Sequence, residues 1–282
     1  MKIILVFTYL PMGGIVIAFK EFSPFKGIWD SPWVGLKNFE TYFSGTYFIR
    51  NLTNTLMINV YSLVFGFPLP IIFALLLNEV RSKSFKKSIQ TISYMPHFIS
   101  IVVVVGMVTT FLNPESGIIN ILRSALGMEK VYFLTKSEWF RPIYTLMYIW
   151  KETGFGAVIY ISALAGGNQE LYEACVIDGG GKWRQLLNVT LPGIASTIMV
   201  MLILRIGGMI EVGYEAIILL YQPATYPTAD VISTFIYRTG LGSAQPKYSL
   251  SAAVGLVNSV VSLMLVLFSN YISKKYTETS VL

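Results

Sequence analysis

Charged residues are scarce in this sequence. Asp, Glu, Lys and Arg make up 13% of its 282 residues, whereas 54% are hydrophobic. Soluble domains carry about 25% charged residues, so this chain has about half the usual means of facing water. Its charges also cluster between long apolar runs, a pattern typical of an all-α protein that crosses a membrane several times.

Cysteine and histidine are each present once. The single cysteine, Cys175, excludes an internal disulfide and a cysteine-rich metal site, and we interpret it as a small packing residue. With one histidine and neither H-E-x-x-H nor G-x-S-x-G, the chain lacks the groups that intramembrane hydrolysis requires. We therefore expect a protein that is not an enzyme, with no metal site and no cofactor.

Internal repeats and low-complexity linkers are also missing, so residues 1–282 are interpreted as one membrane domain. Secondary transporters usually show internal repeats and more spans, which makes that class the weaker alternative. The net charge of +6 is explained by basic residues at the ends of spans, so we expect no nucleic acid as a partner.

Apolar runs of about 20 residues, the length that crosses the hydrocarbon core, predict six transmembrane helices, with core spans over about residues 52–272. The predicted spans are Ile3–Phe19, Leu52–Leu77, Ile92–Leu112, Ile143–Ala165, Leu191–Ile210 and Leu250–Ile272. The first is short and contains Pro11. A cleaved signal peptide is the alternative, but no small-residue cleavage site follows, so we interpret it as a retained span, at the start of a slightly truncated chain or of a complete one.

Orientation follows from the short loop "NEVRSKSFKKSIQ". It packs four basic residues into positions 81–87, which predicts a cytoplasmic location. Alternation then places residues 20–51, 113–141 and 211–249 outside, and residues 166–190 and both termini in the cytoplasm. The aromatic-rich outer segments suit lipid headgroups, or a lip that meets an external partner.

The stretch "YEACVIDGGGKWRQLLNVTLPG", from Tyr172 to Gly193, ends its glycine run in a lysine, as a phosphate-binding loop does. The first glycine of a Walker motif would fall at Val176, however, and Trp183 replaces the required hydroxyl, so we exclude a nucleotide site. We predict instead a helix capped by Asn168, a break at the glycines 179–181, and a second short helix before Pro192. An interfacial amphipathic loop is the simpler alternative.

The spacing of Glu173-Ala174, Asp178-Gly179 and Leu191-Pro192 resembles the EAA motif of permease subunits in binding-protein-dependent ABC importers. That motif reads E-A-A, two residues, D-G, then roughly a dozen residues to L-P, always on a cytoplasmic loop. Cys175 replaces the second alanine and Gly180 the alanine that usually follows Asp-Gly. Both replacements are small, so we expect the docking surface to be retained.

The resemblance extends along nearly the whole chain, through "AFKEFSPFKGI", "SPWVGLKNF", "LLNEVRSKSFKK", "QTISYMPHFIS" and "DVISTFIYRTGL". These segments resemble the carbohydrate-uptake class, closest to polysaccharide and oligosaccharide permeases of Gram-positive bacteria. The resemblance implies the type I ABC importer permease fold, with a cytoplasmic helix-turn-helix coupling loop at residues 166–192. A non-sugar substrate of a related importer remains the alternative.

The resemblance also implies the partners. These are a second permease subunit, a cytoplasmic dimer of ATP-binding subunits, an extracellular solute-binding lipoprotein, a sugar substrate and membrane lipid. ATP hydrolysis would then occur in the separate subunit, and the coupling loop would sit in a cleft of that subunit. The residues that match the coupling motif are Glu173, Ala174, Asp178, Gly179, Leu191 and Pro192.

Polar residues inside the predicted spans are candidates for the translocation path, because an ionisable group at bilayer depth costs about 2.5–3.5 kcal/mol unless it faces a cavity or a partner. These candidates are Lys151, Glu152, Arg205, Glu211 and Asn258. Lys151 and Glu152 are adjacent on a helix, so their side chains should point about 100° apart and should not share a narrow seam.

Aromatic residues of the fourth predicted span, Trp150, Tyr148 and Tyr160, could pack on the apolar face of a sugar ring or simply face lipid or other helices. A structural pairing of Glu152 with Arg205 is as well supported as a contact with substrate. We interpret His97, at the inner mouth of the third predicted span, as an interface residue.

Overall fold

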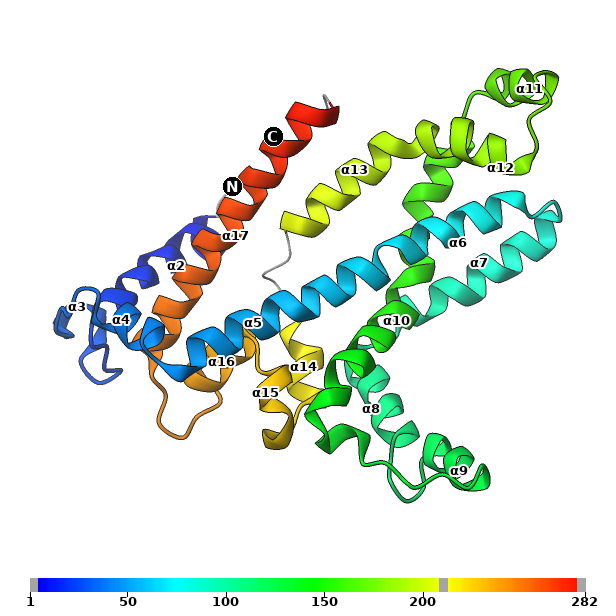
Figure 1. Cartoon of the computed structure of the whole chain (residues 1–282). Helices are drawn as coiled ribbons and strands as arrows, with labels where there is room; N and C mark the ends of the chain where they lie inside the picture. The colour runs from blue at the N-terminus through cyan, green and yellow to red at the C-terminus, as the bar shows by residue number, and fades with distance from the viewer. Residues whose placement is uncertain (1–4, 208–212, 278–282) are drawn as a thin grey trace.

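The computed structural model describes residues 5–207 and 213–277, and every regular element in these ranges is helical, which confirms the predicted all-α fold (Figure 1). With η marking π or 3-10 segments, the elements are η1 (Leu5–Tyr9), α2 (Leu10–Met12), η2 (Gly13–Phe19), α3 (Gly27–Asp30), α4 (Lys37–Phe43), α5 (Thr46–Tyr61), η3 (Ser62–Gly66), α6 (Pro68–Glu79), α7 (Lys83–Phe98), α8 (Ile101–Phe111), α9 (Ile118–Ala125), η4 (Phe133–Thr135), α10 (Ser137–Ala165), α11 (Gln169–Ile177), α12 (Lys182–Gln185), η5 (Leu186–Thr190), α13 (Leu191–Gly207), α14 (Tyr214–Leu220), η6 (Pro223–Thr225), α15 (Tyr226–Ala229), α16 (Ile232–Gly240) and α17 (Tyr248–Thr277).

Three described helical stretches are long and apolar enough to cross a membrane: Thr46–Glu79, Lys182–Gly207 and Tyr248–Phe268. They contain the second and most of the fifth and sixth predicted spans. The bent pair of α7 and α8 adds a fourth if it is one span. The fourth predicted span lies within α10, whose apolar character is interrupted by Lys151 and Glu152.

The third predicted span, Ile92–Leu112, is not one straight helix. Helix α7 ends at Phe98, and α8 begins at Ile101 after a bend of 97°. Pro96 lies in the last turn of α7, where it has no backbone N–H to donate and its ring crowds the preceding turn. The third predicted span is therefore broken after this proline into two helices that meet at a bend.

The first predicted span is helical but irregular over its described residues. Its path changes from the π-helical η1 to α2 and then to the 3-10 helix η2. Pro11 lies within the short α2, between the two irregular segments, which fits the local break. Residues 3 and 4 of that span lie outside the described residues.

Helix α10 is the central element, and α6, α7 and α13 pack along it. The crossing with α7 is so close that a Cβ on Gly154 would lie 2.0 Å from the carbonyl oxygen of Ser93. Ala74 of α6 is buried in one cluster with Ala157 and Tyr160 of α10. Small residues thus let the α10 backbone approach its neighbours, as in other packed membrane helices.

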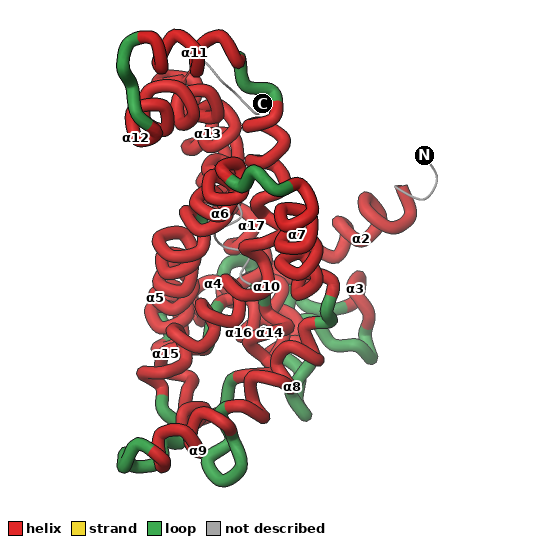
Figure 2. Tube along the Cα trace, turned by 90° about the vertical axis from the view of Figure 1, so that its right-hand side faces the viewer, coloured by secondary structure: helices red, strands yellow, loops and turns green. Residues whose placement is uncertain are grey.

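The two ends of the molecule are formed by different helices. In Figure 2, α11 and α12 lie at the top and α9 lies at the bottom, with α10 between them. An ion pair of 2.9 Å between Lys182 and Glu79 places the start of α12 beside the end of α6. The basic turn between α6 and α7 and the segment of residues 166–190 therefore lie at the same end.

Candidate functional site

Helix α11 begins as its sequence predicts. The Asn168 side chain accepts a hydrogen bond of 2.9 Å from the backbone N–H of Glu170. This bond satisfies an N–H group that has no partner within the helix. Glu170 lies in the first turn, where the helix dipole favours a negative charge.

The helix ends in a left-handed turn at Gly179, where φ is +73°. The N–H of Gly180 donates to the carbonyl of Cys175 at 2.8 Å, and the N–H of Gly179 donates to that of Val176 at 2.9 Å. Together these two bonds form the Schellman arrangement that closes many helices at glycine. The predicted break at the glycines is confirmed, with Gly179 as the residue of positive φ.

The second predicted helix of this loop is confirmed, and it continues directly into the fifth predicted span. Residues 182–207 form one continuous helical stretch, in which the π turn η5 joins α12 to α13. The N–H of Leu191 donates back to Leu186, and this wider turn suits Pro192, which has no N–H of its own. The Tyr172 hydroxyl lies 3.1 Å from that of Thr190, which ties α11 to this turn.

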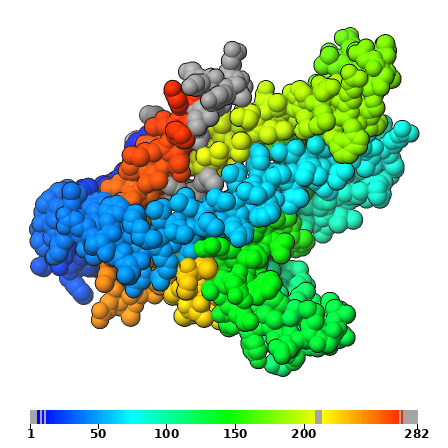
Figure 3. Space-filling view, viewed as in Figure 1, coloured from blue at the N-terminus to red at the C-terminus, as the bar shows by residue number. Residues whose placement is uncertain are grey.

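The surface of α11 and α12 is apolar as well as acidic. Large side chains are exposed on it, with Ile177 at 85%, Trp183 at 76% and Val176 at 58%. Glu173 and Asp178 are exposed among them. In the space-filling view this segment projects beyond the helices that carry it (Figure 3). An exposed apolar patch of this kind is typical of a surface that binds another protein.

Two cavities lie beside α10 and share part of their lining. One of about 300 Å³ lies between α6, α10 and α13. The other, of about 500 Å³, lies between α8, α10, α13 and α14. Tyr148, Glu152 and Arg205 line both cavities, and Lys151 lines the second. The structure thus brings together polar residues of two predicted spans.

Lys151 and Glu152 share this cavity, so the prediction that they could not was wrong. The Lys151 amine lies 3.5 Å from a Glu152 oxygen and donates a hydrogen bond to the carbonyl of His97. Glu152 also contacts the imidazole of His97 at 2.8 Å, and that ring stacks on Phe155 at 4.0 Å between centroids. His97, near the end of α7 before the bend, thus contacts the cluster, and its interpretation as an interface residue stays a prediction.

The remaining candidates for the translocation path do not join the cluster of Lys151, Glu152 and His97. The guanidinium carbon of Arg205 lies 4.8 Å from the centre of the Tyr148 ring, and the predicted pairing with Glu152 is not among the described contacts. Trp150 is 47% exposed and is not part of either cavity wall. Asn258 lies on α17 with its side-chain oxygen buried and unbonded among the described residues. The remaining candidate, Glu211, lies outside the described residues.

Comparison with known proteins assigns this architecture to a family. Residues 66–278 match the family described as the binding-protein-dependent transport system inner membrane component. This chain belongs to that family. It is a non-catalytic, multi-pass membrane subunit of an ABC importer.

Two relatives from Bacillus subtilis (strain 168) are similar over most of their length. The permease is 45% identical to Protein LplB over 274 residues, which cover 97% of this chain and 86% of LplB. It is 44% identical over 277 residues to the polygalacturonan/rhamnogalacturonan transport system permease protein YteP, covering 98% of this chain and 86% of YteP.

Solved structures are similar in fold as well as in sequence. One chain of a bacterial ABC transporter involved in the import of the acidic polysaccharide alginate matches with a TM-score of 0.90 and 49% identity, covering 97% of this chain and 92% of that one. A bacterial alginate ABC transporter in complex with an alginate pentasaccharide-bound periplasmic protein contains a chain that matches with a TM-score of 0.90 and 48% identity. That match covers 99% of the permease and 92% of the other chain.

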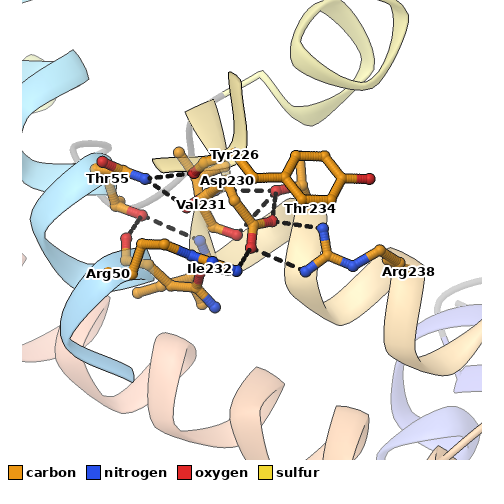
Figure 4. Close-up of polar contacts among 10 residues, drawn as sticks. Arg50, Thr55, Tyr226, Asp230, Val231, Ile232, Thr234 and Arg238 are labelled. Carbon is orange, nitrogen blue, oxygen red and sulfur yellow. Dashed lines mark hydrogen bonds and ion pairs between the residues drawn. The ribbon is translucent and has the colours of Figure 1, made fainter. Parts of the chain in front are cut away.

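A second polar cluster of the permease was missed in the sequence. Asp230 is fully buried and accepts hydrogen bonds from Arg50 at 2.8 Å and from Arg238 at 2.8 and 2.9 Å (Figure 4). Thr234 donates to the same carboxylate at 3.0 Å, and Asn54 donates to its backbone carbonyl at 3.0 Å. Because Arg50 and Asp230 are 180 residues apart, nothing local predicted the contact.

This cluster joins α5 to α16, and its charged members Arg50, Asp230 and Arg238 lie in segments predicted to be outside the membrane. Burial lowers the pKa of Arg238, but the hydrogen bonds and the negative charge of Asp230 outweigh burial and raise the pKa above its ordinary value. The arginine therefore stays charged throughout the physiological range. We interpret the cluster as a structural clamp.

Proposed function

We propose that this permease carries an acidic oligosaccharide across the cell membrane, with energy from ATP that a separate subunit hydrolyses. Two relatives support the substrate class, because the name of one refers to polygalacturonan and rhamnogalacturonan and the other structure is of an alginate importer. These are polymers of sugars that carry carboxylates. The polar cavity beside α10 provides charged and aromatic groups suited to such a ligand.

The observation that carries the coupling role is the exposed surface of α11 and α12. We propose that this surface docks into the ATP-binding subunit through the residues that match the EAA motif: Glu173, Ala174, Asp178, Gly179, Leu191 and Pro192. Its apolar side chains would be buried by the partner. The continuous helix from α12 into α13 would transmit movement of the docked loop to Arg205 at the cavity.

We further propose a six-span topology with both termini in the cytoplasm. The bent pair α7–α8 and helix α10 supply the third and fourth spans, and residues 3–19 supply the first. The complete importer would add a second permease subunit, a dimer of ATP-binding subunits and an extracellular solute-binding lipoprotein. Helix α10 and the cavities beside it would then line a path shared with the second permease.

The proposed function is tested with the complete importer reconstituted in proteoliposomes. We expect oligogalacturonates or alginate oligosaccharides to stimulate ATP hydrolysis and to be taken up, while neutral maltooligosaccharides of the same length are not. Uptake of the neutral series alone would contradict the proposed substrate class. ATP hydrolysis by this chain in the absence of the other subunits would contradict its role as a non-catalytic subunit.

A further inference from the structure

Arg205 is a half-buried cation whose partners differ from those of Arg50, Arg238 and Lys151. Arg50 and Arg238 both pair with Asp230, and Lys151 pairs with Glu152. Arg205 forms no ion pair with any described residue, and its contact is with the ring of Tyr148. Among the described residues its charge is offset by Tyr148, through the ring face and a side-chain hydrogen bond, and by no carboxylate.

The position of Arg205 makes this unusual. It lies within the fifth predicted span, where a charged side chain is costly unless it faces a cavity or a partner. It faces two cavities, and one of them is lined by the rings of Phe67, Tyr148 and Tyr160. A cation–π contact stabilises a guanidinium without using up its capacity to donate hydrogen bonds.

The carboxylates of the larger cavity do not take the place of a counterion. Glu152 is already engaged by His97 and Lys151. Glu215, on α14, is exposed and forms no ion pair with a described residue. No carboxylate of the described residues therefore occupies the planar fork of Arg205, and an external carboxylate is a partner that its geometry matches well.

We propose that Arg205 binds a carboxylate of the saccharide during its passage, while the aromatic rings of the smaller cavity pack on the sugar. This inference rests on the proposed function and deepens it. Arg205 would make the permease itself selective for acidic saccharides, in addition to any selection by the binding protein. Tyr148 would act as a positioning residue that holds the guanidinium toward the cavity.

The first measurement is equilibrium binding to the complex of this chain with its partner permease and ATPase, without binding protein. The probes are trigalacturonate and its fully methyl-esterified counterpart, which has the same backbone and no charge. We expect the unmodified complex to prefer the acid about tenfold or more, since a charge-assisted hydrogen bond contributes that much. Arg205→Gln should abolish this preference by weakening only the binding of trigalacturonate. Arg205→Lys should keep part of the preference.

The matched control is Lys136→Gln, which removes one positive charge from an exposed position outside both cavities. It should leave the preference unchanged. Equal weakening of both probes by Arg205→Gln would show a structural role and overturn the proposal. An unmodified complex that binds the two probes equally, or binds neither, would overturn it as well.

Uptake separates this inference from the proposed function. If the unmodified importer takes up trigalacturonate and Arg205→Gln does so at the same rate, the proposed function stands and the role of Arg205 is wrong. If the unmodified importer takes up no acidic saccharide, the proposed function itself has failed. The expected result is uptake by the unmodified importer and a loss of about tenfold in the Arg205→Gln variant.

Discussion

At the residue scale, the turn after α11 explains how two departures from the EAA motif fit together. Gly179 takes the left-handed conformation that the Schellman turn requires. A Cβ on Gly180 would lie 2.5 Å from the sulfur of Cys175 and 2.6 Å from its carbonyl oxygen. The sulfur contact links Cys175 and Gly180 sterically, whereas the carbonyl contact would meet any side chain at position 180.

Gly179→Val should disrupt coupling. At φ of +73° a side chain costs about 1–2 kcal/mol, and a β-branched residue is especially unsuited to this region. Nothing lies within 4 Å of the added Cβ, so the effect should come from the backbone and tilt α11. We expect sugar uptake to be lost while the permease pair still reaches the membrane. Normal uptake with the ATPase bound would contradict the coupling role.

Gly180→Ala should impair uptake in the natural sequence and be rescued in part by Cys175→Ala. The second substitution removes the sulfur that the new Cβ would meet, although the carbonyl contact at 2.6 Å remains. Cys175→Ala alone should be silent. A double-mutant cycle on uptake rate or thermal stability measures the coupling, for which about 0.5–3 kcal/mol is typical of residues in contact. Strict additivity would show that the two positions are independent.

At the element scale, α10 organises the molecule because its neighbours approach it so closely. Gly154 contacts the backbone of α7, and Gly66 admits the ring of Tyr148 to the turn between α5 and α6. The bend between α7 and α8 places His97 against α10. The polar cluster of the cavity therefore depends on helix packing.

Gly154→Ala should destabilise the permease. Its Cβ would lie 2.0 Å from the carbonyl oxygen of Ser93, so α7 and α10 must move apart, and overpacking of this kind costs about 1–3 kcal/mol. Thermal unfolding of the purified complex in detergent measures the loss. Gly106→Ala is the matched control, because nothing lies within 4 Å of its Cβ in α8, and it should be neutral or stabilising. Equal behaviour of the two variants would contradict the close crossing.

Asp230→Asn should weaken the clamp between α5 and α16. The amide keeps the shape but leaves Arg50 and Arg238 without a counterion. We expect a loss of about 3 kcal/mol, the low end for a broken buried ion pair, because the two arginines are 31% and 26% exposed. Glu115→Gln, in an ion pair exposed at both partners, should cost at most about 1 kcal/mol. Equal losses of thermal stability in Asp230→Asn and Glu115→Gln would show that the clamp contributes little.

At the scale of the whole molecule, the two candidate functional regions of the permease lie at different positions along its helices. The exposed surface of α11 and α12 lies at one end, and the polar cavity lies further along α10 and α13. The continuous helical stretch of residues 182–207 runs from the first region to Arg205 in the second. Under the proposed coupling role, this helical stretch would connect the ATPase at one end with the cavity at the other.

Glu173→Lys should uncouple the importer without unfolding it. Glu173 is exposed and forms no ion pair with a described residue, so reversing its charge should leave the stability of this chain nearly unchanged. We expect the ATPase to co-purify poorly, or to hydrolyse ATP without responding to substrate. Co-purification and substrate-dependent ATPase activity measure this, and Glu170→Lys on the same helix tests whether any charge reversal on α11 has the same effect. Full coupling in Glu173→Lys would show that this carboxylate does not contact the ATPase.

The sequence by itself determined the features that depend on local chemistry. The shortage of charged residues indicated a membrane protein. Asn168 and Gly179 indicated where α11 begins and ends. The spacing from Glu173-Ala174 and Asp178-Gly179 to Leu191-Pro192 indicated the family. Each of these follows from composition, from backbone conformation or from residues within about six turns of helix of one another.

Only the tertiary structure decided which distant residues meet. Asp230 lies 180 residues from Arg50, and His97 lies 55 residues from Glu152, so no local pattern links either pair. The angle between Lys151 and Glu152 was judged for a narrow seam beside one isolated helix, but residues of α8, α10, α13 and α14 together form a cavity wide enough for both. Helix packing sets which groups share a cavity, because each cavity wall is contributed by several helices.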